Sequence, residues 1–439
     1  MDTRGKYESN VQRIGLSCDA FSTGCLIMCL LFFVPYVAEN GGTLVMWFLP
    51  LACLVPFVVM PLVYMVIHKF DTVLFGRYHF VMPLAAFVAA PFFVMAWSAF
   101  GVGAAQSCLV FFGILIFAIT IMVYRYCAFS VRARLTNSGI EDRAPLYEAF
   151  TALGCISAVA AFCGFLHYDS QTAYVNTAYV MGGLTVVLTL AQYLITFYDI
   201  PRLGGKRVQS VKSMFVSFYG ELDTKIYLSV LFFEAAFACI AALLVYFGFA
   251  LGVGLYGTIA VAATVIAVYG VSACVCSRRI TRRSMTLSVI DIVCVTLSAA
   301  VLTVLAALGD KGDGTLAGLI IAAVIVGFGG AVAVRQSKLR FLTVKPRVTT
   351  GTVFILSELT MFAAAGIALF VAAIVATVIE ASTYSTVSFI FGFGIAVLLA
   401  VAAFVLCARP PLKRSGSSNG NEVTRTVLTS DVDSYSQNS

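Results

Sequence analysis

The sequence predicts an all-α integral membrane protein with twelve transmembrane helices arranged as two six-helix halves. The first observation is composition: 61% of the 439 residues are hydrophobic and 11% are charged, whereas soluble proteins average about 45–50% apolar and about 25% charged residues. The second is a series of twelve apolar runs, each close to the ~20 residues that a helix needs to cross a bilayer. The third is that basic residues gather between alternate runs.

The apolar runs form two sets of six, separated by a polar linker at residues 199–225. The N-terminal six-helix bundle, residues 18–198, contains runs at 20–38, 44–67, 80–99, 107–124, 148–166 and 174–198. The C-terminal six-helix bundle, residues 226–407, contains runs at 226–248, 254–276, 286–308, 316–334, 351–379 and 385–407. A polar lead at residues 1–17 and a Ser-rich tail at residues 408–439 flank the bundles. We expect the tail to be disordered, because it has too few apolar residues to form a core.

The basic residues support the count of twelve. If the N-terminus is cytoplasmic, all but one of the 28 Lys and Arg residues fall in segments on the cytoplasmic side, and Lys311 is the exception. Cytoplasmic segments of membrane proteins carry such an excess of Lys and Arg. The lead, the linker and the tail are therefore predicted to be cytoplasmic. The net charge of +7 comes from these segments, so it does not indicate nucleic-acid binding.

The hairpin between the second and third runs carries a motif. Residues 68–83 read HKFDTVLFGRYHFVMP. Twelve runs in two halves, with Asp71 and then Gly76-Arg77 in this hairpin, resemble the major facilitator superfamily of transporters. The resemblance implies that Asp71 bonds to the start of a neighbouring helix and stabilises the outward-open form. It also implies that Gly76 allows the turn and that Arg77 pairs with an acid or with a helix end.

A second, narrower resemblance is to the glycoside–pentoside–hexuronide cation symporter branch of that superfamily. The Pro61-Leu-Val-Tyr segment and the Glu141-Asp142-Arg143 segment are similar to that branch. The resemblance implies that Asp19 contacts a sugar. The branch carries cation-binding acids in its second and fourth spans, whereas the second and fourth runs of this chain contain no acid. Sodium coupling through that site is therefore not expected.

Acidic residues inside apolar runs are a further signal, because a charge in hydrocarbon costs at least ~2.5–3.5 kcal/mol and usually has a partner or a function. Five acids lie near the cytoplasmic starts of their runs: Asp19, Glu148, Glu234, Asp291 and Glu358. Glu148 and Asp291 lie near Arg clusters, which predicts either a layer of structural ion pairs or part of a cytoplasmic gate. That gate is predicted to contain Asp71, Gly76, Arg77, Arg143, Glu148 and Asp291.

Glu234 and Glu358 lie deeper in their runs, and no Lys or Arg occurs inside any predicted span to neutralise them. They are therefore candidates for proton coupling, and facilitated diffusion without a coupled ion fits the sequence equally well. In the superfamily the central cavity is lined mainly by spans one, four, seven and ten. The resemblance thus implies a set of substrate-binding residues: Asp19, Ser22, Tyr124, Glu234 and Thr315.

An enzyme is not predicted. The chain has three His residues and no Cys-x-x-Cys pair, and it shows neither a nucleophile constellation nor a Gly-rich phosphate-binding loop. We therefore expect no catalytic residues, no metal and no cofactor. The predicted partners are a small-molecule solute, the lipid bilayer and, in a coupled mechanism, protons.

The sequence thus predicts a secondary transporter that moves a small organic solute across a membrane by alternating access, with or without proton coupling. A polytopic membrane scaffold or viral envelope protein without transport activity is the alternative. A polar space at the centre of the bundle would favour the transporter, because a scaffold is expected to fill its bundle with apolar side chains.

Overall fold

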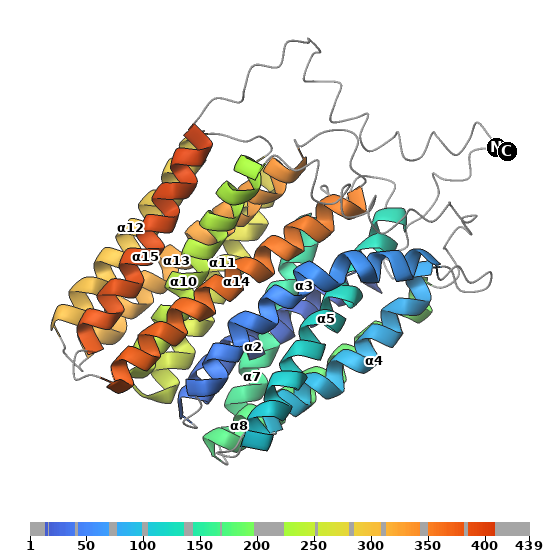
Figure 1. The fold of residues 1–439 in the computed structure, drawn as a ribbon, viewed down its shortest axis with the longest axis horizontal. Coiled ribbons are helices and arrows are strands. Elements are labelled where there is room, and N and C mark those ends of the chain that lie inside the picture. The colour runs from blue at the N-terminus through green and yellow to red at the C-terminus, as the bar shows by residue number, and fades with distance from the viewer. Residues whose placement is uncertain are drawn as a thin grey trace, which may run out of the picture.

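The computed structural model describes residues 14–15, 17–39, 43–69, 77–98, 104–135, 144–166, 169–196, 224–250, 253–280, 285–308, 313–342, 350–381 and 385–408 (Figure 1). The described residues form twelve helices and no strand, which confirms the all-α prediction. In the first half these are α2 (Cys18–Glu39), α3 (Thr43–Lys69), α4 (Arg77–Ser98), α5 (Ala104–Leu135), α7 (Ala144–Phe165) and α8 (Ser170–Thr196). In the second half they are α10 (Thr224–Ala250), α11 (Gly254–Arg279), α12 (Met285–Leu308), α13 (Asp313–Leu342), α14 (Thr350–Ala381) and α15 (Ser385–Ala408).

Each of the twelve predicted apolar runs overlaps one of these helices. Within the described residues, ten helices are long and apolar enough to cross a membrane, from α4 to α15. Residues 70–76 of the 68–83 hairpin, most of the linker and nearly all of the terminal segments lie outside the described ranges. The domain boundaries and the locations of these segments therefore stay predictions.

Two helices continue well beyond their apolar runs. Helix α5 continues to Leu135 although its run was predicted to end at 124, and α13 continues to Leu342 although its run was predicted to end at 334. The residues that follow each run include no Gly or Pro and several good helix formers, so the backbone hydrogen bonding continues into the charged segment. As a result, Arg125 and Arg335 lie inside helices rather than in loops.

The two halves pack in the same way. In the first half, α2 packs on α7 and α8, α4 packs on α5 and α8, and α3 packs on α5. Replacing each helix by the one six places later gives the contacts of the second half: α10 on α14 and α15, α12 on α13 and α15, and α11 on α13. Figure 1 shows the two halves beside each other, with the second half on the left. Two structurally equivalent halves are typical of secondary transporters.

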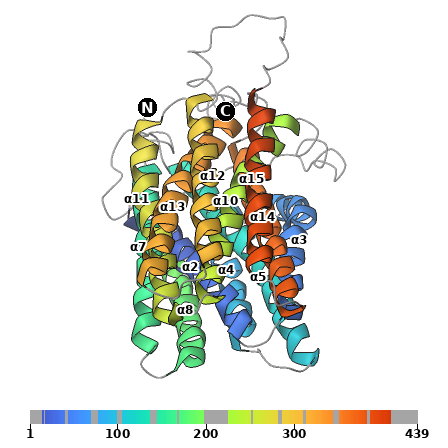
Figure 2. The ribbon, with the colours of Figure 1, turned by 90° about the vertical axis from the view of Figure 1, so that its left-hand side faces the viewer.

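The interface between the halves follows the same symmetry. Helix α3 packs on α14, its equivalent α11 packs on α7, and α2 packs on its own equivalent α10. The Trp47 indole nitrogen donates a hydrogen bond to the Thr377 hydroxyl at 3.2 Å, and its ring meets Phe370 edge-on at 5.6 Å. Consecutive helices alternate in direction (Figure 2). The end of the bundle at which α2 begins and α15 ends is called the basic end below.

The α2–α7 contact in the first half is made by backbone against backbone. A Cβ atom added at Gly24 would overlap the Thr151 carbonyl, and one added at Gly154 would overlap the Phe21 carbonyl. Two thiols beside these glycines lie reciprocally against the opposite helix: Cys25 Sγ is 3.4 Å from the Gly154 carbonyl and Cys155 Sγ is 3.3 Å from the Gly24 carbonyl. Small residues commonly allow such close approach of membrane helices.

Candidate functional site

A charged pair joins the two halves. Arg125 on α5 pairs with Glu358 on α14: Nε lies 2.8 Å from Oε2, and Nη2 donates to Oε1 at 2.8 Å. Both side chains are mostly buried, with exposed fractions of 18% and 11%. The Nη2–Oε1 contact is a charge-assisted hydrogen bond, whereas the Nε–Oε2 contact is a close approach of opposite charges without hydrogen-bond geometry. The residues are 233 positions apart, so only the packing of the halves brings them together.

This pair corrects one premise of the sequence interpretation. The expectation that no Lys or Arg neutralises Glu358 is wrong, because Arg125 binds it directly. Arg125 follows the fourth apolar run by one residue, and the continuation of α5 to Leu135 places it inside the helix. A proton-coupling role for Glu358 stays a prediction, but it cannot rest on an unpaired carboxylate.

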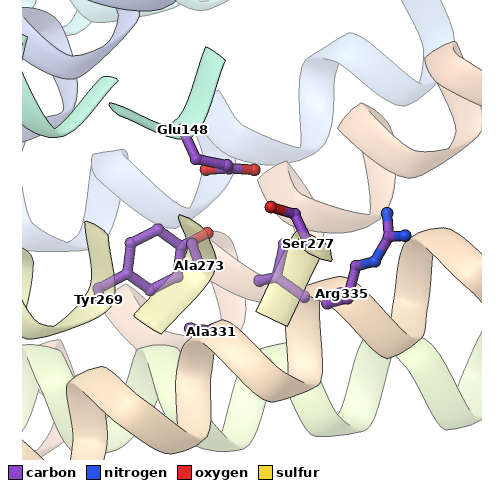
Figure 3. A pocket seen from close by; sticks show the side chains of 7 residues that line it. Glu148, Tyr269, Ala273, Ser277, Ala331 and Arg335 are labelled. Carbon is purple, nitrogen blue, oxygen red and sulfur yellow. The ribbon is translucent and has the colours of Figure 1, made fainter. Parts of the chain in front are cut away.

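A small cavity lies between α7, α11 and α13 (Figure 3), and one of its lining residues, Tyr269, is influenced by the charge of Arg125. The volume open to the centre of a water molecule is about 20 Å³, which is room for roughly one ordered water. Glu148 from the first half and Arg335 from the second lie at its rim. The lining consists of Glu148, Tyr269, Ala273, Ser277, Ala331, Val334 and Arg335.

Two of the lining side chains, Arg335 and Ser277, form hydrogen bonds at the end of α11. The Arg335 Nε donates to the carbonyl of Ile280, the C-cap residue of α11, at 3.1 Å. A cation at this place is favoured, because the last carbonyls of a helix carry partial negative charge. The Ser277 hydroxyl donates to the Cys274 carbonyl at 2.9 Å. The described structure contains no direct ion pair between Arg335 and Glu148, although Glu148 has other contacts.

The two Arg–Glu sets are equivalent in the two halves. Arg335 and Glu358 follow Arg125 and Glu148 by the same 210 residues. Helices α5 and α13 are equivalent in the packing, and so are α7 and α14. Arg125–Glu358 and Arg335–Glu148 are therefore symmetry-equivalent pairs: in each, an Arg of one half faces a Glu of the other half. The first pair is in contact at 2.8 Å, whereas the residues of the second pair line a cavity. The sequence interpretation did not identify Arg125 and Arg335; the shared spacing was the available signal.

Two further groups belong to this charged cluster. Tyr269 on α11 lines the cavity, and the charges of Glu148, Glu234 and Arg125 act on its hydroxyl. Glu234 lies on α10 and is 9% exposed. The cluster of Arg125, Glu148, Glu234, Arg335 and Glu358, together with Tyr269, thus draws on helices of both halves.

The predicted substrate-binding residues are not gathered at one place. Asp19, Ser22 and Tyr124 come together inside the first half, where the Tyr124 hydroxyl interacts with Asp19 and Ser22. Glu234 lies in the charged cluster between the halves. Thr315 is the third residue of α13, which begins at the end of the bundle opposite the basic end. A common role for these five residues stays a prediction.

The predicted gate residues are only partly visible. Asp71, Gly76 and Arg143 lie outside the described residues, and Arg77 begins α4 with a side chain that is not described. Asp291 is fully buried on α12 and accepts a hydrogen bond from the Gln336 amide of α13 at 2.8 Å. That bond lies within the second half, whereas Glu148 lies between the halves, so the two acids differ in their surroundings.

Neither a family model nor a curated protein sequence matches this chain. Solved structures do match it. The nucleoside transporter NupG has a TM-score of 0.63 at 14% identity, over 92% of this chain and 100% of that chain. A Major Facilitator Superfamily transporter, FucP, in the outward conformation has 0.55 at 14%, over 90% and 97%. A bacterial homologue of the iron transporter ferroportin, outward-facing, has 0.57 at 13%, over 91% and 98%. The TM-scores and coverages show a common fold, and at identities this low the likeness shows the fold alone. The narrower resemblance to the cation symporter branch stays a prediction.

Proposed function

We propose, from the premise that this chain has the fold of the major facilitator superfamily, that it is a secondary transporter moving a small organic solute across a membrane by alternating access. In this mechanism two halves rock about a central site, which opens first to one side of the membrane and then to the other. The observation that carries the proposal is the Arg125–Glu358 pair between the halves. Its equivalent, Glu148 and Arg335, lines a cavity between the halves without forming a direct ion pair in the described structure.

The charged cluster favours a transporter over a membrane scaffold. A scaffold is expected to fill the space between its helices with apolar side chains. Here both Arg and Glu side chains from the two halves meet at the interface. Charges within a membrane protein are costly and usually serve a pathway or a moving part. The contact between the halves is therefore suited to breaking and forming again.

We call Arg125–Glu358 the first latch and Glu148–Arg335 the second latch. Both lie toward the basic end, so approach of the halves at that end favours both contacts, although each can form without the other, and opening of that end separates both. The structure has the first latch closed and the second open. Hydrogen bonds to charged groups contribute about 1.5–3 kcal/mol, so loss of one latch is expected to change the balance between open and closed forms by about tenfold or more.

The basic end is proposed to face the cytoplasm, because nearly all Lys and Arg residues are predicted to lie on that side. The boundaries proposed above for the two bundles, the linker and the terminal segments follow from the same topology. The solute is proposed to be a small organic molecule, which the similarity to a nucleoside transporter supports. Transport is proposed either to be coupled to protons through Glu234 or to proceed by facilitated diffusion without a coupled ion.

The test begins with purified protein in detergent. A thermal-shift screen against nucleosides, sugars and other small solutes is expected to identify a stabilising compound, and proteoliposomes are then expected to take up that compound in labelled form. If no compound stabilises the protein and the proteoliposomes exclude every labelled candidate, the transport proposal fails.

The latch is tested separately with the same uptake assay. Glu358→Gln and Arg125→Gln are each expected to reduce uptake about tenfold, and the exchanged pair Arg125→Glu with Glu358→Arg is expected to recover part of it. Asp169→Asn, an exposed acid away from the interface, is the control and should transport normally. Full uptake in both single variants would show that the latch has no part in transport.

A further inference from the structure

A second polar cluster lies inside the first half, apart from the charged cluster. It is formed by α2, α5 and α8, and none of its side chains is more than 3% exposed. The Tyr124 hydroxyl interacts there with Asp19, Ser22 and Thr189. Gln192 follows Thr189 by about one turn on the same buried face of α8. These residues are called the polar chamber: Asp19, Ser22, Tyr124, Thr189 and Gln192.

The chamber has hydrogen-bonding capacity that the described protein groups do not use. The Thr189 hydroxyl donates to the Thr185 carbonyl at 2.7 Å, so it presents only acceptor lone pairs to the chamber. Neither Nε2 nor Oε1 of Gln192 has a hydrogen-bond partner in the described structure, and neither the Ser22 nor the Tyr124 oxygen makes a bond of good geometry there. Buried polar groups are nearly always hydrogen-bonded. The chamber is therefore chemically suited to a polar or charged ligand.

The fold itself does not require these polar residues. The buried face of α8 carries Thr185, Thr189, Gln192 and Thr196. Its equivalent, α15, carries small apolar residues at the same spacing of four, three and four on its buried face: Ala396, Ala400, Ala403 and Cys407.

Direct packing in the second half shows the same contrast. Phe233 of α10 packs against Ala403 and Cys407 of α15 in an apolar cluster. Helix α10 is the equivalent of α2, so an aromatic ring fills the region that corresponds to the polar chamber. The equivalent contact in the second half is thus made by apolar side chains, and packing alone does not account for the polarity of this contact in the first half.

We propose that the polar chamber binds one monovalent cation of the sodium class. Its donors are a carboxylate, three hydroxyls and an amide, and oxygen donors suit hard cations. A single carboxylate, Asp19, balances one unit of positive charge, whereas a divalent ion would leave an uncompensated charge in a buried site. Among the described residues no group of three or more His, Cys, Asp or Glu side chains is placed to hold a metal ion, and the chamber itself contains only one such residue, Asp19, so a transition metal has no ligand set there.

The site also has a direct route to the first latch. Tyr124 and Arg125 are consecutive residues of α5, and successive helical residues point about 100° apart. One faces the chamber and the other faces α14. A cation that orders this turn of α5 therefore also orders the arginine of the latch. This coupling rests on the proposed transport function, whereas cation binding itself does not.

The test measures the thermal stability of the purified full chain against sodium chloride, with choline chloride keeping the ionic strength constant. The wild type is expected to show a saturable stabilisation by Na⁺. Ser22→Ala, Thr189→Val and Gln192→Leu each remove one donor, and each is expected to raise the half-saturating Na⁺ concentration about tenfold. Asp19→Asn is expected to abolish the response.

Thr177→Val is the matched control. Thr177 is a buried threonine on the same helix, its hydroxyl donates to the Ala173 carbonyl at 2.7 Å, and it lies outside the chamber. This variant should respond to Na⁺ like the wild type. Equal stability of the wild type in Na⁺ and choline would overturn the proposal, and so would an unchanged response in the Ser22, Thr189 and Gln192 variants. A stability that follows pH through Asp19 with no response to Na⁺ would assign the chamber to a proton and also overturn it. None of these outcomes depends on solute uptake.

Discussion

At the scale of single residues, the five acids predicted near the cytoplasmic starts of apolar runs differ in their partners. Glu358 binds Arg125, Asp291 accepts a hydrogen bond from Gln336, and Glu148 lines the cavity between the halves. Asp19 lies in the polar chamber of the first half, and Glu234 lies in the charged cluster. One sequence signal, an acid near the start of an apolar run, thus corresponds to three surroundings: the charged cluster, the polar chamber and the Asp291–Gln336 contact inside the second half.

The two proton-coupling candidates are expected to behave differently. Glu234→Gln removes a group that can take up and release a proton, so we expect loss of uptake driven by a proton gradient, while exchange of solute across the membrane continues. Glu358→Gln breaks the first latch and is expected to slow both processes. Parallel uptake and exchange assays in proteoliposomes measure the difference. Normal pH-driven uptake by Glu234→Gln would refute the role of Glu234 in coupling, and uptake that never depends on pH would identify a facilitator.

Asp169 provides a pH-dependent prediction outside the membrane-spanning helices. It caps α8: the Thr172 hydroxyl and backbone amide each donate to its carboxylate at 2.6 Å. The hydroxyl bond, followed by the amide bond, lowers the pKa of Asp169. A carboxyl with a lowered folded-state pKa stabilises the fold above its unfolded pKa and loses that effect as pH falls through the folded pKa.

We therefore expect Asp169→Ala to melt about 1–3 °C below the wild type at neutral pH. The difference should shrink once the pH falls below about 4. Asp169→Asn, which keeps a capping oxygen, should melt closer to the wild type than Asp169→Ala does. Thermal unfolding of the purified protein at several pH values measures this. A melting difference for Asp169→Ala that stays constant down to the most acidic pH would contradict the assignment of the carboxylate as the titrating cap.

At the scale of the helix, close backbone contact is concentrated where α2 crosses α7. Gly154 faces the Phe21 carbonyl without room for a Cβ atom, whereas Gly164 on the same helix has nothing within 4 Å of the equivalent position. The two glycines therefore separate the effect of the crossing from the general effect of a glycine in a helix. Glycine itself costs about 1 kcal/mol relative to alanine in a helix interior.

We predict opposite effects of the same substitution at these two positions. Gly154→Ala is expected to destabilise the protein, because backbone of α2 must move, at a cost typical of overpacking, about 1–3 kcal/mol. Gly164→Ala is expected to be neutral or slightly stabilising. Thermal melts of the purified variants, with the yield of folded protein as a second measure, compare them. Equal melting temperatures for the two would show that the crossing tolerates a wider separation.

At the scale of the whole molecule, the equivalence of the two halves organises both the interface and the sites. It places two Arg–Glu pairs across one interface and contrasts a polar region between α2 and α8 in the first half with an apolar contact between α10 and α15 in the second. The two halves pack alike but differ in the chemistry of this region. Such a difference suits a molecule in which the first half binds a ligand there and the second half does not.

Orientation in the membrane is the prediction that belongs to this scale. The distribution of Lys and Arg predicts that the lead, the linker and the tail are cytoplasmic. In a variant freed of reactive native thiols, cysteines introduced at Ser210 in the linker and Ser417 in the tail should not be labelled by an impermeant reagent applied to intact cells. Lys311→Cys, in a predicted outer loop, is the positive control. Strong labelling at Ser210 or Ser417 would overturn the orientation.

The sequence by itself determined the class of protein, the number of helices and the approximate extent of each. Those properties depend on the hydrophobicity of about twenty consecutive residues, and hydrophobicity is a local sum that needs no knowledge of neighbours. It also contained the 210-residue spacing that relates Arg125 to Arg335 and Glu148 to Glu358. Without helix-to-helix contacts, that spacing had no spatial meaning.

Only the tertiary structure decided which charges meet. Hydropathy does not say which neighbour a helix face contacts, so the sequence could not show that Arg125 binds Glu358 across the interface. Nor could it show that Tyr124 on the preceding position interacts with Asp19 and Thr189 inside the first half. Side chains of consecutive residues on a helix point about 100° apart, and the packing of the helices determines what lies in each direction.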